Sequence, residues 1–214
     1  MGVGEPVDVT SDGAQATPRK TGHNWLDIGV AFAAIFISLV SLYIAMENQK
    51  TQRDLLAASN WPFLREVRSN EYSDRLDVAL GVSNGGVGPA KIKTFALLYD
   101  GQPMRSGLDL LRHCCGLGMT DADITRQLPH GYEFSMVDET VLRPGEDNVV
   151  LGVHREPTAP EIPQRLIANL HRVSFRACYC SVLNECWESD LRSTHTTPVA
   201  QCAAPAVRYV PNGN

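Results

Sequence analysis

The sequence lacks the excess of positive charge that nucleic-acid binding requires. Its 214 residues include 19 lysines and arginines against 24 aspartates and glutamates, which gives a net charge of −5 at pH 7. The basic residues form no stripe along the chain. Because nucleic-acid-binding domains concentrate positive charge on one surface, we do not expect nucleic acid as a partner.

Motifs for metal binding and catalysis are scarce as well. The six histidines form neither an H-x-x-x-H nor an H-E-x-x-H pattern. The glycine-rich run at 84–89 is not followed by the Lys-Ser/Thr pair of a phosphate-binding loop. Asp121, Asp123 and Asp138 fall in polar stretches that are typical of solvated loops. We therefore expect no enzyme, no catalytic residue, no cofactor and no resident metal.

The chain does contain one long uncharged segment, from Ile28 to Met46. As a helix rising about 1.5 Å per residue, it nearly crosses a hydrocarbon core of roughly 30 Å. Trp25 and Tyr43 lie near its two ends, at the depth of the membrane interface. A cleaved signal peptide is the alternative, but the run is long and no small-x-small cleavage site follows it. The sequence predicts a single-pass anchor, with the lipid bilayer as its partner.

The basic residues that flank this segment do not decide its orientation. Arg19 and Lys20 precede it, and Lys50, Arg53 and Arg65 follow it. The positive-inside rule compares such residues on the two sides and finds them nearly balanced.

Five small residues recur along the anchor at spacings of three and four, so they share one side of the helix: Ala31, Ala34, Ser38, Ser41 and Ala45. Small residues allow helices to approach closely in lipid. We interpret this seam as a packing face for a second copy of the chain or for another envelope protein. The alternative is that small residues are simply common in membrane helices.

The whole chain divides into four parts by composition. Residues 1–22 lack an apolar run and predict a disordered tail, and 23–59 form the transmembrane helix and its stalk. Residues 60–195 predict one folded domain, and 196–214 an irregular C-terminal tail. Trp61-Pro62 marks the end of the helix, because proline cannot continue it.

Apolar residues alternate within the domain with a period of two, which is typical of half-buried strands. Strands are expected at 76–83, 91–99, 132–142, 149–153, 172–180 and 186–191, with a hairpin around 143–147. Two helical insertions are expected at about 107–116 and 161–171. The predicted fold is mainly β: an N-terminal transmembrane helix and an immunoglobulin-like antiparallel β-sandwich of about seven strands, with two short helical insertions.

This order of features resembles a group of uncharacterised bacterial single-pass membrane proteins. The residues that carry the resemblance are Trp61-Pro62-Phe63-Leu64, then Asn84-Gly85-Gly86-Val87-Gly88-Pro89-Ala90 before a strand, then Asp100-Gly101. It covers roughly residues 28–101, with the N-x-G-x-G-P-A strand motif at its centre. The resemblance implies a bacterial source and a membrane location, and it implies no activity.

Six cysteines are the remaining chemical feature. The candidates for disulfides are Cys114, Cys115, Cys178, Cys180 and Cys186, and the sixth cysteine is Cys202. Cys180 and Cys186 flank a five-residue loop and can pair across it, with Cys178 tied to Cys114 or Cys115. Soft-metal ligands that include His113, and free thiols in a reducing compartment, remain alternative interpretations.

Disulfides favour an oxidising compartment, and thus a domain in the periplasm of a bacterial inner-membrane protein. The function that these features favour is a membrane-anchored β-sandwich module for binding or scaffolding in the envelope. A cysteine-based redox or metal-responsive sensor is the alternative.

Overall fold

The computed structural model describes residues 24–69, 76–154 and 160–211, so the predicted tail at 1–22 lies outside the described residues. The chain divides into two compact units, Met1–Thr51 and Gln52–Asn214. The helix α1 runs from Asn24 to Ser59. Its apolar side chains are exposed, and it is long and apolar enough to cross a membrane, which confirms the predicted N-terminal helix by length and composition.

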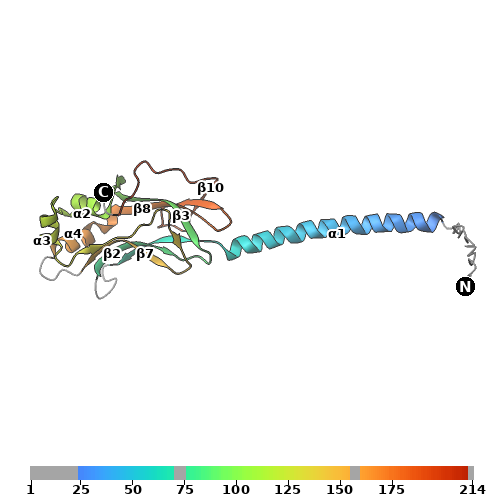
Figure 1. Cartoon of the computed structure of the whole chain (residues 1–214), viewed down its shortest axis with the longest axis horizontal. Coiled ribbons are helices and arrows are strands. Elements are labelled where there is room, and N and C mark those ends of the chain that lie inside the picture. The colour runs from blue at the N-terminus through green and yellow to red at the C-terminus, as the bar shows by residue number, and fades with distance from the viewer. Residues whose placement is uncertain (1–23, 70–75, 155–159, 212–214) are drawn as a thin grey trace, which may run out of the picture. The chain divides into compact units, whose positions relative to one another are not determined.

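The second unit is mainly β, as predicted, with antiparallel strands in two sheets (Figure 1). One sheet has the strand order β1 (Leu64–Ser69), β2 (Leu76–Asn84), β7 (Asp147–His154), β5 (Tyr132–Glu133). The other has the order β10 (Thr197–Val199), β9 (Cys186–Ser189), β8 (Val173–Cys180), β3 (Ala90–Tyr99), β4 (Gln102–Met104), with β6 (Val141–Leu142) also paired to β3. The described ranges therefore hold ten strands rather than about seven.

The core lies between the two sheets, because each contributes one apolar face to it. Val78, Leu80 and Val82 alternate along β2 and are fully buried. From the other sheet, the rings of Phe95 and Phe175 contact each other with centroids 5.4 Å apart. The period-two pattern therefore identifies the side chains of β2 that enter the core, but β2 is not half-buried as expected, because Ala79 and Ser83 on its other face are only 1% and 2% exposed.

The predicted hairpin around 143–147 is correct only in part: β5, at the start of the expected strand 132–142, pairs with β7, but the residues next to the turn do not. β6 pairs with β3, whereas β7 pairs with β2 and β5, so the segment between them carries the chain from one sheet to the other. The segment is a turn in which Glu146 N donates to Arg143 O at 3.1 Å. A turn signal between two apolar stretches reports a change of direction, and it does not specify which strands pair.

The glycine-rich motif after β2 is organised around the side chain of Asn84, which is fully buried. Its Oδ1 accepts hydrogen bonds from Phe63 N at 3.3 Å and Gly86 N at 3.0 Å. Its Nδ2 donates to Gly88 O at 2.8 Å and to Leu142 O at 3.0 Å. One amide thus links the entry to β1, the turn after β2, and β6 in the opposite sheet.

The glycines of this motif allow two backbones to approach. A Cβ added at Gly86 would overlap the backbone of Trp61 and Phe63, and one at Gly88 would overlap the backbone of Asn60. Val87 N donates to Trp61 O at 3.0 Å in the same contact. The motif therefore holds the segment that follows α1 against the end of β2.

Both predicted helical insertions are present, as α2 (Gly107–Cys115) and α4 (Glu161–Asn169). Leu110, Leu111 and Leu166 are fully buried, so the two helices cover part of the core. A third helix, α3 (Asp121–Gln127), was not expected and replaces the solvated loop assigned to Asp121 and Asp123.

The C-terminal segment is not simply an irregular tail. It begins with β10, which pairs with β9, and it later inserts the ring of Tyr209 into the core. Tyr209 is 2% exposed, its hydroxyl donates to Val150 O at 2.8 Å, and its ring lies 5.5 Å from that of Phe95. The segment from β10 to Tyr209 therefore belongs to the folded domain.

Candidate functional site

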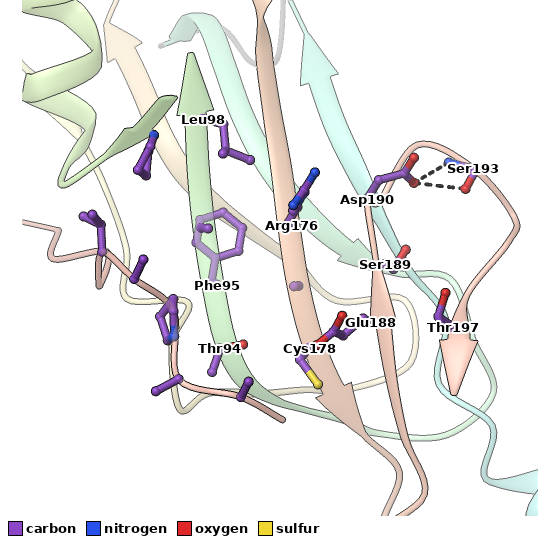
Figure 2. A pocket seen from close by; sticks show the side chains of 18 of the residues that line it. Thr94, Phe95, Leu98, Arg176, Cys178, Glu188, Ser189, Asp190, Ser193 and Thr197 are labelled. Carbon is purple, nitrogen blue, oxygen red and sulfur yellow. Dashed lines mark hydrogen bonds between the residues drawn. The ribbon is translucent and has the colours of Figure 1, made fainter. Parts of the chain in front are cut away.

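A cavity of about 550 Å³ lies on the side of the six-stranded sheet that faces away from the core (Figure 2). Thr94, Ala96 and Leu98 of β3 and Arg176 of β8 line it. Residues 203–207 form one wall, and β9, β10 and the loop between them form the other. We call this cavity the outer groove, and we call residues 200–207 the C-terminal strap.

The strap is fixed at both ends. Near its start, Cys202 is bonded to Cys178 of β8, with their Cα atoms 5.7 Å apart. After it, Arg208 Nε donates to Asp138 Oδ2 at 3.0 Å, and Val210 N donates to Arg105 O at 2.7 Å. Together with the buried ring of Tyr209, these contacts keep the strap beside β3, so the groove is a feature of the folded chain.

The groove carries charges of both signs. Arg176 is exposed and extends from the middle of β8, and Glu188 and Asp190 follow one another along the opposite wall (Figure 2). Glu188 is the cross-strand partner of Cys178. Small and apolar side chains of β3, including Ala96 and Leu98, lie on the other side of Arg176 from these two carboxylates. The arrangement suits a ligand with apolar groups and polar or charged groups along its length.

The cavity also contains a serine, an aspartate and a histidine, yet their hydrogen bonds shape the loop. Asp190 Oδ1 accepts from Ser193 N at 2.9 Å, Arg192 N at 3.0 Å and Ser193 Oγ at 3.0 Å. These hydrogen bonds lower the pKa of the Asp190 carboxyl, and the bond from the Ser193 amide has the largest effect. Ser193 Oγ also contacts the backbone carbonyl of His195 at 3.2 Å. The carboxylate is thus engaged in holding a turn.

Residues 81–85 read Gly-Val-Ser-Asn-Gly and match the G-x-S-x-G pattern of a nucleophile elbow. The structure gives this pattern another meaning. Ser83 is 2% exposed within β2, and the chain continues through a turn into β3. A nucleophile elbow needs an exposed serine between a strand and a helix, so Ser83 does not fit that role.

Two disulfides lie beside the groove. Cys180 and Cys186 are cross-strand partners in β8 and β9 and are bonded to each other, which is the pairing considered from the sequence. Cys178 is bonded to Cys202, whereas the sequence had suggested Cys114 or Cys115. Cys178 and Cys180 are 3% and 4% exposed although they lie on the outward face of β8. The strap, and no helix, lies over that face.

Cys114 and Cys115 are bonded to each other at the end of α2. Arg165 Nη1 donates to Cys115 O at 2.9 Å, and Asn169 Nδ2 donates to Cys114 O at 3.4 Å. These bonds from α4 satisfy carbonyls at the end of α2 that have no partner within the helix. His113 is half exposed and its ring contacts Asp109, so it lies apart from the sulfur atoms of β8 and β9.

The predicted packing seam lies on exposed helix surface. All five small residues are exposed in α1, and Ser38 Oγ donates to Ala34 O at 2.7 Å. The serine hydroxyl is therefore satisfied within its own helix, and the seam presents a narrow, smooth surface.

No protein-family model matches this chain, and no curated protein matches it.

Proposed function

We propose that this chain is a membrane-anchored binding or scaffold module of the bacterial envelope. The outer groove carries this proposal. It is a preformed cavity whose wall is held by a disulfide on one side and by a buried tyrosine on the other. Preformed cavities with a few charged groups among apolar ones are typical of binding sites.

The proposed occupant is an extended segment of another envelope protein. The groove is open, and its two walls are themselves extended chain, the strap on one side and β9 with β10 on the other. Arg176 and Glu188 offer charges of opposite sign to polar groups of such a segment, while Ala96 leaves room for an apolar side chain.

We further propose an immunoglobulin-like sandwich in the periplasm, anchored in the inner membrane. Antiparallel strands in two sheets with one shared core support this fold. Three cysteine pairs at bonding distance support an oxidising compartment. The resemblance of the Asn84-Gly88 region to bacterial single-pass membrane proteins supports the bacterial source.

Crosslinking in membranes tests the groove. A photoreactive amino acid placed at Thr94 should form a covalent adduct with the partner, and Ala96→Trp, which fills the groove, should abolish that adduct. Ala168→Trp on the exposed side of α4 is the matched control and should leave it unchanged. No adduct at Thr94, or equal loss with both tryptophan variants, would refute a groove that binds a partner.

The topology is tested by counting thiols in intact membranes. Membranes are prepared in a blocking alkylator, and the mass of the intact chain is compared with and without prior reduction. Six protected cysteines are expected for a periplasmic domain. Six alkylated cysteines would place the domain in the cytoplasm.

We propose that the seam of α1 brings two copies of the chain together. Ala34→Leu combined with Ser41→Leu should reduce self-association in a membrane two-hybrid assay, because the larger side chains separate the helices. Ala33→Leu lies off the seam and serves as the control. An unchanged signal from the double variant would remove the seam from the proposal.

A cysteine-based redox or metal-responsive sensor is the second candidate function. The clustering of sulfur atoms next to the strap favours it.

A further inference from the structure

We infer that Cys178, Cys180, Cys186 and Cys202, when reduced, form a binding site for one soft divalent metal ion of the zinc class. The four residues come from three separate segments of the fold. Cys178 and Cys180 alternate on the outward face of β8, Cys186 begins β9, and Cys202 lies in the strap. This inference is independent of the groove's proposed partner.

The sulfur atoms are close enough to share one ion. Those of Cys180, Cys186 and Cys202 all lie within 4.8 Å of one another, and that of Cys178 is bonded to Cys202. Zinc binds four thiolates in a tetrahedron with bonds of about 2.3 Å, which places the sulfur atoms about 3.8 Å apart. Once the two disulfides are reduced, each bonded pair of sulfur atoms must therefore move apart to this spacing, while the other distances among Cys180, Cys186 and Cys202 shorten by up to about 1 Å. Cys178 lies outside that group of three and reaches the ion from its place beside Cys202.

The surroundings select for a soft ion. Among the described residues that line the cavity beside Cys180, Cys186 and Cys202, none carries a carboxylate. Hard ions such as Mg²⁺ and Ca²⁺ require oxygen ligands, whereas thiolates suit zinc. Lys93 lines the same cavity, and its ammonium offsets the negative charge that four thiolates leave on the complex.

A dithiol reductant supplies the electrons and protons that convert the disulfide-bonded chain into the reduced, metal-binding chain. Each disulfide takes two electrons and two protons from one dithiol, which leaves as its own disulfide, so two dithiols yield four cysteine thiols. Binding of Zn²⁺ then releases four protons and forms a tetrathiolate complex with a charge of −2. Cys202 is attached to β8 in both states, through Cys178 when oxidised and through the metal when reduced, so the strap keeps its place.

The experiment uses the full chain in detergent, reduced with a phosphine and titrated with Co²⁺ as a spectroscopic probe. One equivalent should produce the intense visible bands of a tetrahedral thiolate complex, and Zn²⁺ should displace it. Zinc should also raise the melting temperature of the reduced chain, with a β-type circular dichroism spectrum retained. A reduced chain that gives neither the cobalt bands nor a zinc-dependent rise would overturn the inference.

Two variants locate the site. Cys180→Ser and Cys202→Ser should each weaken cobalt binding at least about tenfold. Mutating a residue that only hydrogen-bonds to a metal ligand already lowers metal affinity by that much, and these cysteines are proposed as ligands themselves. The double variant Cys114→Ser with Cys115→Ser should bind as the unchanged chain does. Equal binding by all three variants, or loss only in the double variant, would place the metal elsewhere. A negative result in this metal-binding experiment does not contradict the proposed partner of the outer groove, because the crosslinking experiment uses the oxidised chain.

Discussion

Replacing Asn84 by alanine should strongly destabilise the domain, because its side-chain amide is buried and fully hydrogen-bonded. The side chain makes four hydrogen bonds from a fully buried position, to Phe63 N, Gly86 N, Gly88 O and Leu142 O. In Asn84→Ala all four backbone groups lose this partner, and no second side chain replaces it in the same position.

The magnitude follows from the cost of each lost bond. A typical hydrogen bond contributes about 1 kcal/mol net, and a buried group left without a partner costs about 1–3 kcal/mol. Phe63 and Gly86 are only part-buried, so water can reach their amides, whereas the bonds to Gly88 O and Leu142 O are buried. Two bonds at the lower cost and two at the higher give a loss of about 4–8 kcal/mol. This is a large fraction of the roughly 5–15 kcal/mol by which domains are stable.

Urea denaturation of the full chain in detergent measures this loss through far-ultraviolet circular dichroism of the β-sheets. Asn148→Ala is the matched control. Asn148 Nδ2 makes one hydrogen bond, to Met136 O at 3.0 Å in an exposed setting, so its loss should cost about 1 kcal/mol or less. If Asn84→Ala costs no more than Asn148→Ala, the amide does not hold the motif together and the reasoning fails.

Three further predictions concern the stability contributed by a disulfide, the close approach of backbone at a glycine, and the dependence of stability on pH. Replacing Cys180 and Cys186 by serine should lower stability by about 2 kcal/mol under oxidising conditions and by nearly nothing with reductant, because a short closed loop constrains the unfolded chain; an equal loss in both conditions would contradict the disulfide. Gly88→Ala should cost more in thermal melts than Gly101→Ala, because a Cβ at Gly88 meets backbone whereas Gly101, with φ of 77°, faces open space; the reverse order would contradict the close approach. Burial raises the pKa of Tyr209 above its ordinary value of 10.0, so its contribution to stability is complete below that pH and falls as pH rises beyond it. Tyr209→Phe should flatten this alkaline loss in denaturant titrations at increasing pH, by up to about 1.4 kcal/mol per pH unit, and an unchanged slope would place the titration elsewhere.

The sequence predicted the elements whose signals are local. Val78, Leu80 and Val82 show the period of a strand with one buried face, and the structure places them in the core. The five-residue loop between Cys180 and Cys186 predicted a hairpin because a short connection brings two consecutive strands side by side. The helix α3 had a local signal too, since Thr120 and Asp123 form a capping box that was overlooked.

Partners that are distant in the sequence were not predictable in the same way. The turn at 143–147 has the composition of a hairpin, but β6 pairs with β3 and β7 pairs with β2, which lie in different sheets. Cys178 is bonded to a residue 24 positions later, in a Pro- and Ala-rich segment with no periodic pattern. Neither pairing follows from residue types alone, because each depends on where the rest of the chain lies.

The C-terminal segment explains why the candidate site was invisible in the sequence. Tyr209 fills the core between the sheets, and its hydrogen bond to Val150 fixes the point where the chain enters that core. Given this point and the bond from Cys202 to Cys178, the residues between them must cross the outward face of the six-stranded sheet. The same crossing creates a wall of the outer groove and brings a fourth sulfur to the pair across β8 and β9. The groove and the sulfur cluster thus have one cause, and it is the part of the chain whose composition predicts least.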